Sequence, residues 1–324
     1  MRNLFLFVLI SVPAYSQPDS QNVERVLHFK HTESTQDLQA LVTVVRTITG
    51  IGKASLDSTL KTFTLHASAG QVATAEWLFN QLDQPVKQQA ATSFITDTGD
   101  LVQVFYLSNL LTNQELQEAV TVVRTTVELR NLFVYNPSRA IVVRGSAADV
   151  RLAAWLLKAF DLPANRLESA PHVNESGDLI QVFYFTQPLT HLELVEVATV
   201  VRSTGDLRRL FVYSPSRAIV VRGSAADLRL AGWLLKEFDQ PANRPGFAPR
   251  VNEYRLLEND DDILKVFYLA PTNTVRRMQE IATEVRSTVQ IPRLFTNNVH
   301  RAIVVRGTTA QLARAAQLIE QQGR

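Results

Sequence analysis

Residues 139–145 read Arg-Ala-Ile-Val-Val-Arg-Gly, and the same seven residues return at 217–223 and at 301–307. The second copy begins 78 residues after the first, and the third begins 84 residues after the second. Repetition at a nearly fixed spacing of tens of residues is typical of a chain built from one repeated structural unit. This stretch therefore decides how the rest of the sequence is divided.

The similarity extends well beyond the seven residues. Between residues 130–166 and 208–244, 31 of 37 positions are identical. A more divergent copy comes first in the chain, since a shift of 78 residues aligns Trp77 with Trp155. The sequence therefore predicts a signal segment at 1–16 and four modules, which cover residues 24–85, 101–163, 179–241 and 263–324.

Each module is predicted to contain the same five elements. In the second module, residues 101–107 are rich in β-branched and aromatic residues and predict a strand. A helix follows, and then a hairpin whose strands, 132–135 and 140–144, flank an Asn-Pro turn. A second helix ends the module. The order is βαββα, an α+β module whose three-stranded sheet carries two helices on one face.

Helix starts are marked by capping residues. Thr112 is followed by Glu115 and Ser146 by Asp149, and serine or threonine recurs at the equivalent positions of the other modules. In the last module Thr274 faces Arg277, so the first capping box is lost there. The linkers carry Pro, Asn, Ala and Ser, and part of each, such as 251–257, is a candidate for an extra strand. We expect the third module, cut at about 176–243, to fold alone with marginal stability.

Composition excludes several classes of protein. The hydrophobic content of 46% suits globular modules, and the net charge of +2 is too small for the dense basic surface of a nucleic-acid binder. The chain has no Cys, which excludes disulfides, thiolate metal sites and cysteine nucleophiles.

The first residues predict export. Met1 and Arg2 begin a positively charged segment, an apolar run follows to Val12, and small residues precede Gln17. The run is shorter than the roughly 20 residues that span a bilayer. We therefore expect a cleaved signal peptide at 1–16 and a mature chain that has no transmembrane segment.

The module resembles the N-terminal periplasmic domains of bacterial secretins, of the secretin-N (NolW) type. The features that carry the resemblance are the Phe/Tyr-rich first strand, the Pro-Ser-Arg-Ala-Ile-Val-Val-Arg-Gly hairpin, and the second helix that ends Leu-Leu-Lys-x-Phe-Asp. The resemblance implies a KH-like βαββα fold, a periplasmic location with outer-membrane association, and contacts within an envelope complex. Secretins continue into a large pore domain, and this sequence ends at Arg324, so we expect that the chain is not itself a channel.

Residues that could carry chemistry are few. His28 and His31 lie close together but do not recur, and the acidic run at 260–262 lacks EF-hand spacing, so we expect no metal site. No nucleophile, phosphate-loop or dinucleotide motif occurs. A KH module that binds nucleic acid needs a Gly-x-x-Gly loop, and Gly145 is followed only by Ser-Ala-Ala. We therefore expect no catalytic residue, no cofactor and no nucleic-acid partner.

Two basic positions recur and are candidate interface residues. The first ends the first helix of each module: Arg46, Arg124, Arg202 and Arg286. These cations either complement the helix C-terminus or form ion pairs between modules or subunits. The second flanks the last strand and includes Arg144, Arg222 and Arg306 at its end.

Trp77, Trp155 and Trp233 occupy one position of the second helix, where the last module has Gln317. In the second module Leu152, Trp155 and Leu156 form an apolar face beside the expected core stripe. A helix that is apolar most of the way round is buried on more than one side. The tryptophans either contact a neighbouring module or cover only their own core.

We expect an exported, non-enzymatic assembly protein of the bacterial envelope, associated with a secretin-type secretion or type IV pilus system. Its partner would be a secretin, another subunit of an envelope complex, or further copies of the chain. The alternative is a free-standing periplasmic binding module for an exported protein or peptide, which forms no ring. An enzyme is the third and least favoured interpretation.

Overall fold

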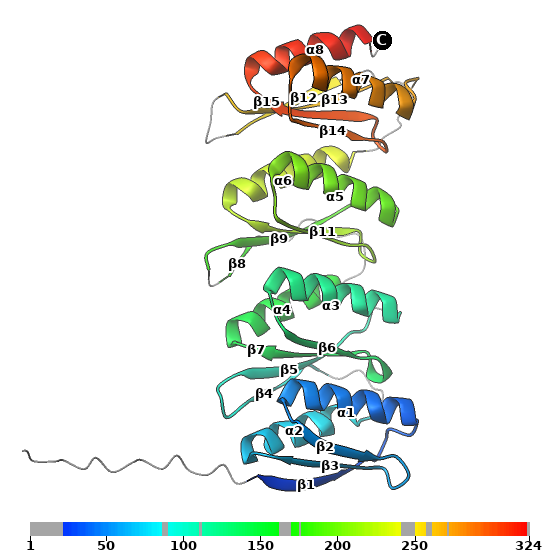
Figure 1. Ribbon diagram of the computed structural model, residues 1–324, viewed down its shortest axis with the longest axis vertical. Coiled ribbons are helices and arrows are strands. Elements are labelled where there is room, and N and C mark those ends of the chain that lie inside the picture. The colour runs from blue at the N-terminus through cyan, green and yellow to red at the C-terminus, as the bar shows by residue number, and fades with distance from the viewer. Residues whose placement is uncertain are drawn as a thin grey trace, which may run out of the picture. The chain divides into compact units, whose positions relative to one another are not determined.

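The computed structural model describes residues 22–85, 90–109, 112–161, 170–174, 176–240, 250–256, 261–270 and 272–322 (Figure 1). The signal peptide predicted at 1–16 lies outside the described residues. The chain divides into two compact units. Unit 1 holds residues up to Pro85 together with Thr96–Thr98, and unit 2 holds Val86–Ile95 and Gly99–Arg324.

Unit 1 contains the first predicted module. Its elements are β1 (Val23–His28), α1 (Thr35–Thr49), β2 (Lys53–Asp57), β3 (Thr62–Ala67) and α2 (Ala69–Leu82). The sheet is antiparallel with the strand order β1-β3-β2. The order βαββα and the three-stranded sheet agree with the prediction.

Unit 2 contains the other three predicted modules, which we call modules 2, 3 and 4. Module 2 consists of β4 (Thr92–Ile95), β5 (Leu101–Tyr106), α3 (Asn113–Val127), β6 (Asn131–Tyr135), a 3-10 turn (Asn136–Ser138), β7 (Ala140–Gly145) and α4 (Ala147–Phe160). Module 3 consists of β8 (His172–Val173), β9 (Leu179–Tyr184), α5 (His191–Gly205), β10 (Arg209–Tyr213), β11 (Ala218–Gly223) and α6 (Ala225–Phe238). Module 4 consists of β12 (Arg250–Arg255), β13 (Ile263–Tyr268), α7 (Val275–Val289), β14 (Arg293–Asn297), β15 (Ala302–Gly307) and α8 (Thr309–Gln322).

Each sheet of unit 2 has four strands, where the repeat alone predicts three. The orders are β4-β5-β7-β6, β8-β9-β11-β10 and β12-β13-β15-β14. The additional strand comes from the linker and pairs antiparallel with the first strand of its module. Without it, the first strand would leave its backbone groups unpaired at the sheet edge. The suspected strand in the linker before module 4 is β12.

Helix starts follow the capping pattern. Reciprocal capping boxes form at Thr112/Glu115, Thr190/Glu193, Ser224/Asp227 and Ser68/Gln71. Thr274 still accepts a hydrogen bond from the amide of Arg277, and the described contacts include no reciprocal bond. The caps fix where each helix leaves the sheet.

The helices of one module lie between two sheets. In module 2, Leu152 and Leu156 of α4 belong to one buried cluster with Ile180 and Val182 of β9, which lie in the next module. The same arrangement joins the helices of module 3 to Leu264, Val266 and Val304 of module 4. The second apolar face of the helix therefore packs on the outer face of the next sheet.

Candidate interaction surfaces

Two contact surfaces join the modules of unit 2. Junction 2/3 is the contact of α3 and α4 with the outer face of the module 3 sheet, and junction 3/4 is the equivalent contact of α5 and α6 with the module 4 sheet. In each junction the first helix of one module lies against the edge strand of the next, α3 on β10 and α5 on β14. The apolar cores make both junctions extensive, and polar contacts at their margins fix how the modules meet.

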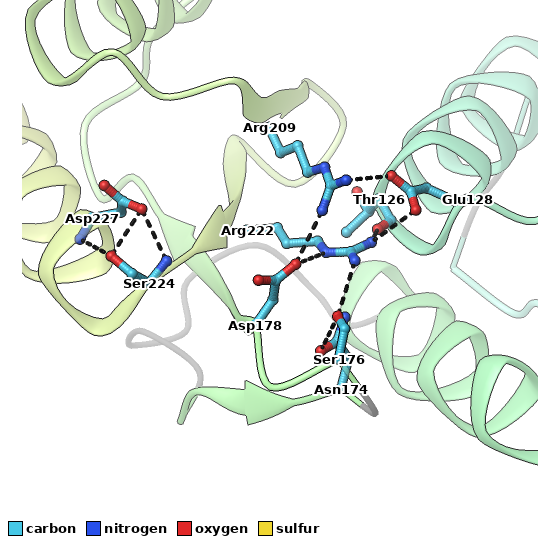
Figure 2. Close-up of polar contacts among 9 residues, drawn as sticks. All are labelled: Thr126, Glu128, Asn174, Ser176, Asp178, Arg209, Arg222, Ser224 and Asp227. Carbon is cyan, nitrogen blue, oxygen red and sulfur yellow. Dashed lines mark hydrogen bonds and ion pairs between the residues drawn. The ribbon is translucent and has the colours of Figure 1, made fainter.

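Arg222 is the centre of the polar contacts in junction 2/3 (Figure 2). Its side chain is 7% exposed, Nη1 donates to the carbonyl of Thr126 at 2.7 Å, and Nε donates to Asp178 at 3.0 Å. Thr126 lies in the last turn of α3, where carbonyl groups lack helical partners. The guanidinium therefore joins the end of a helix in module 2 to an acidic residue of module 3.

Arg209 extends this cluster. Its Nη2 lies 2.7 Å from the carboxylate of Glu128, and its Nη1 lies 3.0 Å from Asp178 (Figure 2). Glu128 is the left-handed residue that ends α3, with φ 68°. An acidic residue at the helix end thus pairs with a cation of the next module.

Three further contacts complete junction 2/3. The carboxylate of Glu118 accepts the amide of Ser214 at 2.6 Å, and the hydroxyl of Tyr184 donates to the carbonyl of Ala159 at 3.1 Å. The rings of Phe160 and Tyr213 are stacked with centroids 4.1 Å apart. Burial raises the pKa of Tyr213 well above its usual range, and the negative charges of Glu118, Glu115 and Asp161 add to the shift. Its hydroxyl has no hydrogen-bond partner among the described residues.

Junction 3/4 repeats these contacts at equivalent positions. Arg306 donates to the carbonyl of Thr204 at 3.0 Å and to Asp262 at 2.7 Å. The remaining pairs are Arg293 with Asp206, the Asn298 amide with Glu196, and the Tyr268 hydroxyl with the Glu237 carbonyl. Because these polar contacts join equivalent residues in both junctions, they are a property of the module and not of one pair of neighbours.

The predicted arginines divide into two groups. Arg124, Arg202 and Arg286 each donate to the carbonyl of the second residue of the following edge strand: Leu132, Leu210 and Leu294. Arg46 donates instead to the carbonyl of Gly52, the residue before the edge strand β2. All these bonds lie within a module, where each arginine covers a backbone carbonyl at or beside the edge strand. An interface role for this group stays a prediction.

The other group lies near the end of the last strand of modules 2, 3 and 4. Arg222 and Arg306 lie in the junctions, and Arg144 pairs with Asp100 of its own module at 2.8 Å. The ring of Trp155 is stacked on His172 of β8, and Trp233 lies against Tyr254 of β12, with centroids 5.2 and 5.3 Å apart. Each of these tryptophans thus contacts the strand that leads into the next module, whereas Trp77 lies half-buried on α2.

Several junction residues escaped the sequence analysis. Glu118, Tyr184 and Asp178 contact a neighbouring module or the central arginine, and each has an equivalent in module 4 or module 3. Their recurrence at the repeat spacing was visible, but surface acids and strand tyrosines are common enough that recurrence alone did not single them out.

A pocket of about 500 Å³ opens beside junction 2/3 between the start of α4 and β8, with Arg151, His172 and Arg222 among its lining residues. A smaller pocket, lined by the equivalent residues Arg229 and Arg306, opens beside junction 3/4. Within the described part of the chain, no three His, Cys, Asp or Glu side chains come together as a metal site would require. Of the acidic run, Asp262 pairs with Arg306, and Asp261 accepts the amide of Thr309.

No family model matches the chain, and no curated protein matches it. Among solved structures it is similar to secretin N-terminal domains. The N-terminal domain of the secretin XcpQ from Pseudomonas aeruginosa is 11% identical with a TM-score of 0.19, over 43% of this chain and 62% of that one. Aeromonas hydrophila ExeD is 13% identical with a TM-score of 0.18, over 68% of this chain and 40% of that one. The chain thus spans less than two thirds of either structure.

Proposed function

We propose that this chain is a non-enzymatic assembly protein of the bacterial envelope that acts through contacts between βαββα modules. The observation that carries the proposal is the repetition of one contact in two junctions, where a helix face of one module binds the sheet face of the next. A module with two complementary faces is built to recognise other modules of its kind. The function is therefore protein recognition, with the modules as the recognition elements.

One feature of the sequence supports an envelope location. Residues 1–16 have the layout of a secretory signal peptide. No helix in the described ranges has the length and apolar character needed to cross a bilayer. We propose that the chain works in the periplasm.

The sequence resemblance to secretin N-terminal domains supports a secretin, or another subunit of a secretin-containing complex, as the partner. Secretin-type secretion and type IV pilus systems are the machines in which such a partner would occur. On this proposal, the chain binds the partner through helix and sheet faces of the same kind as those that form the junctions, because the junction faces themselves are buried within unit 2.

One observation favours the alternative, a free-standing module that binds an exported protein. Leu192 and Val195 on α5 are 78% and 37% exposed, while the equivalent residues on α3 are Gln114 and Gln117. An apolar pair on one module alone suits a single specific partner better than a contact repeated along the chain.

In-cell photo-crosslinking separates these functions. A photoreactive amino acid at Leu192 of the full chain, expressed in the source bacterium, would be crosslinked and the products identified by mass spectrometry. Position Gln114 is the matched control, since it is exposed on the equivalent helix. Products that contain a secretin or another envelope-complex subunit support the leading proposal. Products with only an unrelated exported protein, together with a monomer in light scattering, support the alternative, and retention in the cytoplasm contradicts both.

A further inference from the structure

His300 occupies a buried position in junction 3/4. It lies in the turn between β14 and β15, is 4% exposed, and its ring centroid is 5.2 Å from that of Phe238 at the end of α6. Nδ1 lies 2.7 Å from Oδ1 of Asn297, and backbone groups of Phe238 and Gln240 also hydrogen-bond to the imidazole. The side chain from module 4 is thus enclosed by the end of module 3.

Junction 2/3 has no ionisable group at the equivalent position. Ser216 takes the place of His300, and the equivalent aromatic contact is between Phe160 and Tyr213. The neighbouring contact is the same in both junctions, since Glu118 accepts the amide of Ser214 and Glu196 accepts the amide of Asn298. The two junctions therefore differ at this buried position, where only junction 3/4 has an imidazole. At its margin junction 2/3 has other histidines, since Nδ1 of the exposed His191 lies 2.5 Å from the hydroxyl of Ser214 and His172 stacks on Trp155.

We propose that junction 3/4 is a pH-sensitive contact, in which protonation of His300 weakens the binding of module 4 to module 3 while junction 2/3 keeps its strength. An imidazolium at this site would be a charge enclosed by an aromatic ring and protein backbone, without water. In the separated state the same imidazolium is hydrated. Acid therefore favours separation.

The charged groups around His300 oppose this effect only in part. The backbone hydrogen bonds of Phe238 and Gln240 favour the protonated form, and so do Glu193 at the start of α5 and Asp239 at the end of α6. Burial outweighs them and lowers the pKa of His300 to about 4. Since the exposed histidine titrates near 6.5, the open state binds more protons between these values, and the closed state loses stability as the pH falls from about 6.5 to about 4.

Hydrogen exchange of two matched amides in the full chain tests the proposal. The Asn298 amide reports on junction 3/4 and the Ser214 amide on junction 2/3, because each donates to a glutamate across its junction. After correction for intrinsic exchange rates, the protection of Asn298 should fall roughly twentyfold from pH 7 to pH 5 relative to that of Ser214. The measurement uses the full chain with His191→Val, which gives module 3 the residue that module 4 has at Val275, so that no imidazole contacts the reference residue Ser214.

The variant His300→Ser gives module 4 the residue that module 3 has, and should abolish the difference in pH dependence between the two amides even if it weakens the junction. Titration of the His300 imidazole by NMR is the second measurement, with an expected midpoint well below 6.5. A midpoint near 6.5, an equal pH dependence of both amides, or a difference that survives in His300→Ser would each overturn the proposal.

Discussion

At the scale of single residues, Arg222 shows how a repeated sequence acquires a role from its surroundings. The same Arg-Gly dipeptide ends β7, β11 and β15. In module 3 it reaches the end of α3 in the preceding module, and three of its nitrogens have hydrogen-bond acceptors. A guanidinium is well suited to this position, because its fixed fork of donors can bind a carbonyl and a carboxylate at once.

Replacement of Arg222 by Gln should lower the free energy of unfolding of unit 2 by about 3 kcal/mol, since a buried and paired charge loses its contacts. Chemical denaturation of the full chain measures this change. Arg208→Gln is the matched control, because Arg208 lies on the surface of the same module, and its loss should be within about 0.5 kcal/mol. Equal effects of the two substitutions would show that the Arg222 contacts contribute nothing to stability.

At Tyr213, in contrast to Arg222, we expect that removal of a polar group does not lower stability. Its ring packs on Phe160, but its buried hydroxyl lacks a partner among the described residues. Tyr213→Phe removes an unsatisfied polar group and keeps the ring, so we expect stability to be unchanged or higher by up to about 1 kcal/mol. Tyr213→Ala should cost about 3–5 kcal/mol because the ring contact is lost. A marked loss of stability in Tyr213→Phe, in thermal or chemical denaturation, would mean that the hydroxyl is hydrogen-bonded in solution.

At the scale of elements, the first helix of every module shares one backbone feature at its C-terminal end. Each helix terminates in a left-handed residue: Gly50 in unit 1, and Glu128, Asp206 and Gln290 in unit 2. Glycine adopts this conformation without steric cost, whereas other residues do not. Glu128 and Asp206 offset the cost with ion pairs across the junctions, to Arg209 and Arg293.

Gln290 has the same backbone conformation, with φ 58°, and its exposed side chain is a neutral amide that cannot offset the strain with an ion pair. Gln290→Gly should therefore stabilise unit 2 by about 0.5–1 kcal/mol. The matched substitution Gly50→Ala, at φ 71°, should destabilise unit 1 by a similar amount. Chemical denaturation of both variants measures the two changes in the free energy of unfolding. A loss of stability in Gln290→Gly would show that the glutamine side chain makes a stabilising contact that outweighs the strain.

At the scale of the whole molecule, the division into two units predicts how the chain unfolds. Modules 2, 3 and 4 share buried clusters, so separating them would expose Ile180, Val182 and Val220, which are fully buried. Burial of each such side chain contributes about 1.5–3 kcal/mol. The sequence predicts that module 3 folds alone. The shared clusters predict that it loses several kcal/mol when its neighbours are removed.

Scanning calorimetry of the full chain should therefore show two transitions, one for unit 1 and one for unit 2. A fragment of residues 90–324 should reproduce the second transition with little change in its midpoint. The fragment 176–243, module 3 alone, should unfold at a much lower temperature or show no cooperative transition. Separate transitions for modules 2, 3 and 4 in the full chain would contradict the prediction that unit 2 is one cooperative body.

The sequence alone determined the module and its number. Apolar residues at strand and helical spacing, capping residues before each helix and the Asn-Pro turn are local signals between residues that are close in the chain. They were sufficient for the order βαββα and for the helix starts at Thr112 and Ser146. The number of modules came from the recurrence of residues 139–145 at offsets of 78 and 84 residues.

Only the tertiary structure decided which surfaces meet. The partner of Arg222 lies 96 residues away at Thr126, and the partner of Asn298 lies 102 residues away at Glu196. Such contacts leave no local pattern, because they depend on how the second face of a helix packs on a distant sheet. The same reason explains why Arg124 and Arg222, both recurrent arginines in sequence, differ in structure. One covers a carbonyl of its own module at a sheet edge, and the other is buried between two modules because the outer sheet face beside it is apolar.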